Sequence, residues 1–146
     1  MSKTICVAGA SGLVGSNIVR EALSRGYQVN GTMRNVTTQE RTKYLQRLKC
    51  SENLKLFSAD MLVTGTFNDA LSGVDAVFIT CLIPTYRGPT GVLAREMDYE
   101  QGYREIVKPT VDGCLEILRS AHNEGIKKVI ICSSTSSTNP IPSVSN

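Results

Sequence analysis

Short apolar runs alternate with amphipathic stretches along most of the chain. Runs rich in β-branched residues and bounded by turn residues predict buried strands. Five such runs cover residues 3–8, 27–33, 54–58, 74–81 and 127–132. Between them, apolar positions recur every three or four residues, which predicts helices. These helices are expected from Gly12 to Gly26, after Thr37 or Thr38, over residues 66–71, and from the loop at 83–91 to about His122.

The last predicted helix carries its apolar residues in one stripe. We expect this stripe to face the core, because a stripe at helical spacing is the usual buried face of a helix. Its members are Val107, Val111, Cys114, Leu115, Leu118 and Ala121. Pro109 either kinks the helix or opens a new first turn.

Strands that alternate with helices favour parallel pairing through right-handed crossovers, and therefore an open α/β sheet. The expected strand order is 3-2-1-4-5, as in a doubly wound Rossmann-type domain. A chain of 146 residues can bury the core of one domain, but it is too short for two full domains. We expect this domain to occupy residues 1–138. Residues 139–146, rich in Ser and Pro, are expected to be an irregular tail.

Composition excludes several other classes of protein. A hydrophobic share of 41% and a net charge of +3 are ordinary for a globular domain, and the dispersed basic residues do not favour nucleic acid as a partner. Apolar runs fall far short of the ~20 residues that span a bilayer, and no secretory pattern is seen, so a cytoplasmic location and no membrane partner are expected. Five scattered cysteines and one histidine predict neither disulfides nor a metal site.

A glycine-rich turn separates the first predicted strand from the first helix. Gly9 permits a sharp turn, Gly12 lets the backbone approach a pyrophosphate, and Gly15 allows the helix to pack closely on the sheet. The alternative is that these glycines only mark a turn. The expected cofactor-binding residues of this motif are Gly9, Ser11, Gly12, Leu13, Val14 and Gly15.

An arginine stands where the second strand ends. In Rossmann-type domains an acidic residue at this point selects NAD through the free ribose 2′-hydroxyl. Here the residue is Arg34, and Arg41 and Lys43 follow at the start of the next helix. A guanidinium binds a 2′-phosphate in a bidentate way, which predicts NADP(H) as the cofactor. The alternative is an arginine in a solvated turn.

Three further positions follow strand ends, where ligands of open α/β sheets bind. Asp60 either accepts a hydrogen bond from adenine or serves as a turn residue. Thr80, Cys81 and Leu82 are expected beside the ribose and nicotinamide, although Cys81 also suits a buried apolar site. Ser134 lies in a run of serines after the fifth strand, where a hydroxyl group can bind a substrate carbonyl.

These residues carry a family resemblance. The chain resembles the amino-terminal half of an extended short-chain dehydrogenase/reductase, and within that family it is similar to the dihydroflavonol reductase and cinnamoyl-CoA reductase group. The resemblance covers nearly the whole chain. It rests on VAGASGLVG at 7–15, GTMR at 31–34, ADM at 59–61, IVKPTVDG at 106–113 and KKVIICSS at 127–134.

The resemblance implies NADPH binding by the glycine turn, by Arg34 at the 2′-phosphate, by Asp60 and Met61 at the adenine, and by residues 80–82 along the dinucleotide. It implies a catalytic role for Ser134. The family's catalytic set also has a Tyr-xxx-Lys pair, and none of the five tyrosines here has a lysine four residues later. In the family that pair follows the serine by a few tens of residues, beyond Asn146.

Two functional hypotheses follow from the resemblance. In the first, the chain is the cofactor-binding fragment of a reductase that acts on a small-molecule ketone or aldehyde, without the later strands and the substrate lobe. Apolar surface at the incomplete sheet would then favour self-association. In the second, a short protein binds NADP(H) without catalysis, as redox-sensing relatives do. An NAD-dependent epimerase or dehydratase is less favoured, because those members usually carry an acid where Arg34 stands.

Overall fold

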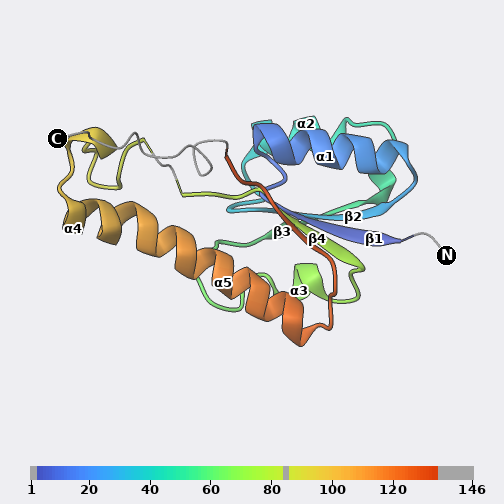
Figure 1. Cartoon of the computed structure of the whole chain (residues 1–146). Coiled ribbons are helices and arrows are strands. Elements are labelled where there is room, and N and C mark those ends of the chain that lie inside the picture. Colours follow the sequence, from blue (N-terminus) through green and yellow to red (C-terminus); the bar gives the residue numbers. More distant parts are fainter. Residues whose placement is uncertain (1–2, 84–85, 135–146) are drawn as a thin grey trace, which may run out of the picture.

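The fold is built on one parallel sheet, seen in a computed structural model that describes residues 3–83 and 86–134 (Figure 1). The strands lie in the order β3-β2-β1-β4-β5, which confirms the predicted Rossmann-type order. Their bounds are β1 Thr4–Ala8, β2 Gln28–Met33, β3 Leu54–Ser58, β4 Ala76–Ile79 and β5 Val129–Ile131. Ala8 of β1 pairs with Thr32 on one side and with Ile79 on the other, so the carboxyl ends of the three central strands lie at one edge.

Helices cover both faces of the sheet (Figure 1). One face carries α1 (Leu13–Ser24) and α2 (Gln39–Gln46), and the other carries α3 (Asn68–Leu71) and α5 (Lys108–Asn123). A short helix α4 (Tyr99–Gly102) and a π-helical turn η3 (Tyr103–Val107) lead directly into α5. The 3-10 turns are η1 (Ser51–Asn53) and η2 (Ala94–Glu96).

Two apolar cores form, one on each face of the sheet. The core beside α1 includes Ile5, Val7, Val19, Leu23, Val29 and Leu45. The core beside α5 includes Phe67, Leu71, Val77, Ile79, Ile117 and Ala121. Successive side chains of a strand point to opposite faces, so Ile5 and Val7 enter one core while Cys6 and Ala8 enter the other.

A buried amide explains the polar residue in the second predicted strand. Asn30 of β2 is 8% exposed, and its Nδ2 donates a hydrogen bond of 2.9 Å to the carbonyl oxygen of Ala70 in α3. A buried polar group without a partner costs stability, and this contact removes that cost. Asn30 therefore joins β2 to the helix α3 rather than weakening the strand.

The predicted core stripe of the long helix is right for three of its six members, because Ala121 is buried and Cys114 and Leu118 pack against the core while partly buried. The prediction is wrong for the other three. Val107, Val111 and Leu115 are 48%, 50% and 40% exposed. Besides the predicted Ala121, the buried residues of α5 are Gly113, Ile117 and Ser120. Gly113 lies so close to Met61 that a Cβ there would approach Met61 Cε to 2.6 Å. Small residues let the helix pack closely on the core, and a search for apolar periodicity gives Gly and Ser no weight.

Pro109 lies in the first turn of α5, which confirms the second of its two interpretations. The preceding π turn η3 separates α5 from α4 without a break in the helical path (Figure 1). The expected boundary between residues 138 and 139 lies outside the described residues. Over residues 3–83 and 86–134, none of the helices has the length and apolar character needed to cross a bilayer.

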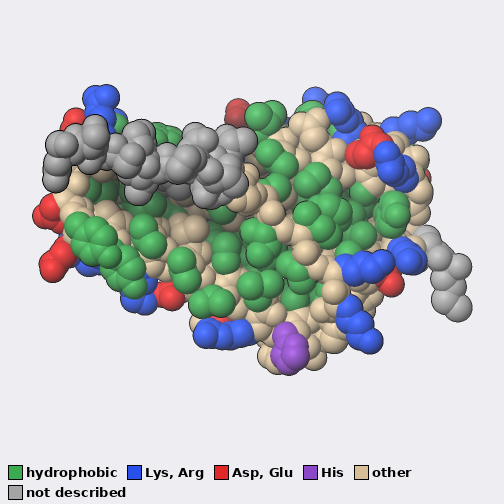
Figure 2. Space-filling model, in the orientation of Figure 1, with side chains coloured by type: hydrophobic (Ala, Val, Ile, Leu, Met, Phe, Trp, Pro, Cys, Tyr) green, Lys and Arg blue, Asp and Glu red, His purple; other side chains and the backbone are tan. Residues whose placement is uncertain are grey.

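Apolar side chains gather on the face that shows β5 and the outer side of α5 (Figure 2). Ile130 and Ile131 of β5 are 42% and 46% exposed, and the outward residues of α5 named above continue this surface. A groove of about 770 Å³ lies between α1 and the sheet, and its lining includes the apolar residues Ile5, Ala76 and Phe78. This face of the protein is thus more apolar than an ordinary solvated surface.

Candidate dinucleotide-binding site

The turn after β1 requires glycine at its first position. Gly9 has a φ of +89°, in the left-handed region, and a Cβ there would lie 2.8 Å from the backbone nitrogen of Cys81. The backbone N–H groups of Gly9 and Ala10 both donate to the carbonyl oxygen of Thr32, at 3.2 and 2.8 Å. These bonds fix the turn to the end of β2, so the turn and β2 form one rigid edge.

Gly15 brings helix α1 against this turn. A Cβ on Gly15 would overlap the carbonyl oxygen of Gly9 and lie 2.9 Å from its carbonyl carbon. The predicted packing role of Gly15 is therefore confirmed. Gly12 is the N-cap of α1, makes no side-chain cap and is exposed, and no acidic residue occupies the first turn. The positive end of the helix dipole thus faces solvent, as binding of a phosphate requires.

Leu13 and Val14 expose their side chains at the start of α1. Leu13 is 84% exposed and Val14 is 50% exposed, and both line the apolar groove between α1 and the sheet. Leu13 and Val14 can offer an anion their backbone N–H groups, which lie at the start of α1. Their side chains contribute to the apolar face described above.

A pocket of about 340 Å³ lies beyond the carboxyl end of β2. It brings together Ser11 of the glycine turn, Arg34 after β2 and Arg41 of α2, which the sequence placed in one site. Asn35 shapes the loop between them, because its Oδ1 accepts hydrogen bonds from the backbone nitrogen and hydroxyl of Thr37 at 2.8 and 2.6 Å. The lining is completed by Met33, Asn35 and Thr38, so the pocket holds two guanidinium groups and no carboxylate.

Asp60 and Met61 follow β3, and both have structural contacts. Asp60 Oδ1 accepts a hydrogen bond of 3.0 Å from the backbone nitrogen of Leu62, which is the turn arrangement of the alternative interpretation. The Met61 side chain is 8% exposed and packs against Gly113 of α5. A binding role for Met61 at the adenine therefore falls to its backbone, since its side chain belongs to the core.

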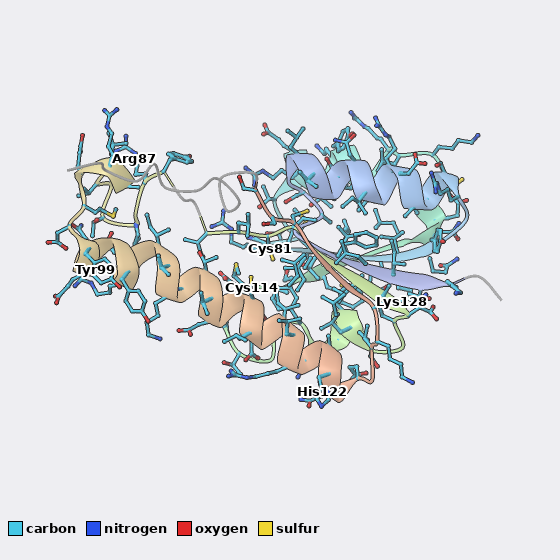
Figure 3. All side chains as sticks on the ribbon, in the orientation of Figure 1. Cys81, Arg87, Tyr99, Cys114, His122 and Lys128 are labelled. Carbon is cyan, nitrogen blue, oxygen red and sulfur yellow. The ribbon has the colours of Figure 1, made fainter. Side chains whose placement is uncertain are left out.

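The end of β4 is tied to the glycine turn. Thr80 Oγ1 donates to the carbonyl oxygen of Ala8 at 2.7 Å and lies 3.3 Å from that of Gly9. The next residue, Cys81, packs on Gly9 and is half-buried, whereas Leu82 is 50% exposed. In Figure 3, Cys81 lies near the centre of the molecule, above Cys114 of α5. Thr80 thus joins the ends of β1 and β4 at the predicted ligand edge.

The Cys81 thiol is expected to react slowly with alkylating agents. Its pKa is raised from 9.0 to about 11, mainly by burial; a backbone hydrogen bond lowers it in part, and nearby Cys114 and Asp60 contribute to the rise. Only the thiolate reacts, so at pH 8 we expect labelling by iodoacetamide to be about 100-fold slower than in a free cysteine peptide. Peptide mass spectrometry measures the rate, with the urea-unfolded chain as the control. Labelling at the rate of the unfolded chain would contradict this expectation.

Ser134 lies at the same edge, three positions after the last residue of β5. Ser134 is exposed. Two positions before it, the backbone nitrogen of Cys132 donates a hydrogen bond to the carbonyl oxygen of Ile79. The chain therefore leaves β5 beside the end of β4, two residues before Ser134. The catalytic role of Ser134 stays a prediction.

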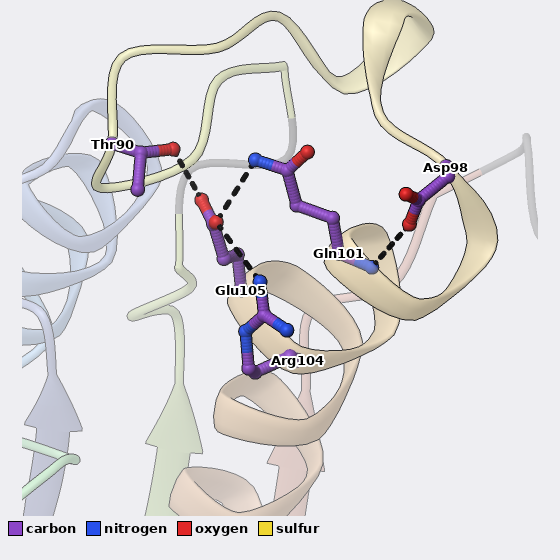
Figure 4. Close-up of polar contacts among 5 residues, drawn as sticks. All are labelled: Thr90, Asp98, Gln101, Arg104 and Glu105. Carbon is purple, nitrogen blue, oxygen red and sulfur yellow. Dashed lines mark hydrogen bonds and ion pairs between the residues drawn. The ribbon is translucent and has the colours of Figure 1, made fainter.

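One polar cluster at this end of the molecule was not predicted. Glu105 of η3 is buried and contacts Thr90 and Gln101 (Figure 4). The sequence does contain a signal, because Glu105 interrupts the region where a long helix should begin and a glycine-rich loop precedes it. Recognising it requires the π turn, which apolar periodicity does not reveal.

A parallel sheet of this order, with a glycine turn between its first strand and first helix, defines a Rossmann-type dinucleotide-binding domain. Sequence comparison agrees and names the family. Residues 9–146 match the NAD(P)H-binding family, and the chain belongs to it.

Several curated proteins that the chain is similar to are reductases. The chain is 37% identical to a dihydroflavonol 4-reductase of Gerbera hybrida over 140 residues, which cover 93% of this chain and 35% of that protein. It is 34% identical to tetraketide alpha-pyrone reductase 1 of Arabidopsis thaliana, covering 90% of this chain and 38% of that one. The chain thus spans about a third of the length of the curated relatives it matches. The predicted resemblance to the dihydroflavonol reductase group of extended short-chain dehydrogenases/reductases is confirmed.

A solved structure supports the same relationship. The structure of vestitone reductase from alfalfa (Medicago sativa) superposes with a TM-score of 0.67 at 31% identity, covering 91% of this chain and 36% of that one. This domain is therefore a reductase-like NAD(P)-binding domain related to dihydroflavonol reductase.

Proposed function

We propose that the chain binds NADP(H), with the pyrophosphate at the glycine turn and the 2′-phosphate between Arg34 and Arg41. The observation that carries this proposal is the 340 Å³ pocket after β2, whose lining has two guanidinium groups and no carboxylate. An acid here would repel a 2′-phosphate, whereas two cations attract it. The structure of Gre2 from Candida albicans in complex with NADPH, 26% identical with a TM-score of 0.68, is a neighbour in keeping with this choice.

We further propose that the chain supplies the cofactor-binding part of a reductase acting on a small-molecule ketone or aldehyde. When bound, NADPH supplies the hydride that is added to the carbonyl carbon. Ser134 donates a hydrogen bond to the carbonyl oxygen, because its position after β5 lies at the edge where the nicotinamide of such domains is held. The oxygen must also gain a proton, which the family takes from a Tyr-xxx-Lys pair. This sequence of 146 residues contains no such pair.

Binding without turnover is the expected behaviour of the 146-residue chain. Titration with NADPH should quench or shift the fluorescence of the chain. The affinity for NADPH should be about 10-fold or more above that for NADH, because only NADPH carries the 2′-phosphate. With a dihydroflavonol or a simple aldehyde added, absorbance at the NADPH band should decline no faster than without protein. Equal affinities for the two nucleotides would reject NADP(H) preference. Turnover above the control would show that the missing pair is not needed.

A further inference from the structure

One carboxylate attaches the segment of residues 86–97, which follows β4, to the long helix (Figure 4). Glu105 is 7% exposed and accepts hydrogen bonds from Thr90 Oγ1 at 2.7 Å and from Gln101 Nε2 at 3.0 Å. Arg104 Nη2 lies 3.8 Å from Glu105 Oε1. The hydrogen bond from Thr90, and then that from Gln101, lowers the pKa of Glu105, so its carboxylate is charged at neutral pH.

The π turn η3 is what aims Glu105 toward this segment. Successive residues of an α-helix are about 100° apart, so in a continuous helix Glu105 would lie about 100° from the buried face of α5. A π turn adds one residue and rotates the residues before it by about the same angle. The rotation brings Glu105 onto the face of Gly113 and Ile117, which points toward the sheet side. Such single π turns occur frequently at functional sites.

Close packing supports the same attachment from the loop side. Gly88 is buried, and a Cβ there would overlap Oε2 of Glu105 and lie 2.6 Å from Cε of Met97. At the other end of the segment, Asp98 Oδ1 caps α4 by accepting a hydrogen bond of 2.8 Å from the backbone nitrogen of Gln101. The segment therefore contacts Glu105 at Gly88 and Thr90, and α4 begins directly after it at the Asp98 cap.

The 86–97 segment lies beyond the carboxyl ends of the strands, on the side where β4 ends (Figure 1). Ligands of open α/β sheets bind outside that edge, and the fourth strand leads past the nicotinamide end of the dinucleotide. We propose that Glu105 is a positioning residue that holds the 86–97 segment as a wall on the nicotinamide side of the NADP(H) site. This inference rests on the proposed function, because it concerns the same site.

Two variants test the role of Glu105. Glu105→Gln keeps the size of the side chain but replaces an acceptor oxygen by an NH2 group, and Thr90→Val removes one donor. Glu100→Gln, which changes an exposed carboxylate on α4, is the matched control. Hydrogen exchange with mass spectrometry reports on the 86–97 segment. Titrations with NADPH and with 2′,5′-ADP, which has the adenosine and the 2′-phosphate but no nicotinamide, report on the two ends of the site.

In both variants we expect exchange in the 86–97 segment to become about 10-fold faster. The Kd for NADPH should rise about fivefold while that for 2′,5′-ADP stays within about twofold, a split that general destabilisation would not produce. The control should change neither quantity. If exchange or the NADPH to 2′,5′-ADP ratio stays as in the unmodified chain, the inference is wrong and the cofactor assignment stands. If the unmodified chain binds neither compound, the proposed function fails, and the wall assignment fails with it.

Discussion

Replacing Arg34 with alanine should weaken NADPH binding by roughly 30-fold and leave NADH binding within about twofold. Arg34 lines the pocket after β2 together with Arg41, and the two side chains come from different elements. A guanidinium bound to a phosphate through two parallel hydrogen bonds loses both on truncation, whereas NADH has no group at that position. Isothermal titration at low and at physiological salt measures the effect.

Salt dependence makes the Arg34 experiment specific. Charge pairs near the surface weaken as ionic strength rises, so the advantage of NADPH over NADH should shrink with added salt in the unmodified chain and much less in Arg34→Ala. Arg47→Ala is the matched control, because Arg47 is also exposed and follows α2 but does not line the pocket. Equal losses for NADPH and NADH in Arg34→Ala would show that Arg34 acts on the loop and not on the phosphate.

Replacing Gly15 with alanine should destabilise the fold by about 3 kcal/mol or more and abolish measurable nucleotide binding. The added Cβ would overlap the carbonyl oxygen of Gly9 and come within 2.9 Å of Thr80 Oγ1. These atoms belong to backbone or to a hydrogen-bonded side chain, so they cannot move aside without shifting α1 from the sheet. Urea unfolding followed by circular dichroism measures the free energy of unfolding.

The matched control for Gly15→Ala is Gly102→Ala. Gly102 is also in a helix, but a Cβ there would meet its nearest neighbour, Met97 Cβ, at 4.0 Å. Alanine in an open helical position costs nothing and removes freedom from the unfolded chain, so this variant should be as stable as the original or slightly more stable. A Gly15→Ala protein that unfolds and binds like the control would contradict the packing described here.

The strand order and the glycine turn were predictable because each rests on local chemistry. Runs of β-branched residues identify the strands, and right-handed crossovers leave few ways to order them. The face of α5 was not predictable in the same way. Gly113 and Ser120 take the buried positions, because the close approach of Met61 leaves no room for larger side chains beside Gly113. Apolar residues such as Val111 and Leu115 are left on the outside.

The residues of the candidate site also differ in whether local sequence predicts them. Ser11, Arg34 and Arg41 were predicted together, since each follows or faces the end of a strand, and they do line one pocket. The core position of the Met61 side chain depends on a contact across 52 residues of sequence to Gly113, which no local pattern shows. Glu105 was missed because its burial depends on one residue of helical insertion at η3.

The outer edge of β5 is preceded by two charged residues that oppose its pairing in parallel with a second copy. In the part of the chain that the structure describes, β5 pairs only with β4, so its other side offers backbone groups to an additional strand. Lys127 and Lys128 come directly before β5 and are exposed. Two copies that paired these edges in parallel would bring the four ammonium groups together, as gatekeeper lysines do at the margins of aggregation-prone strands. Because that opposition is electrostatic, ionic strength sets how well it works.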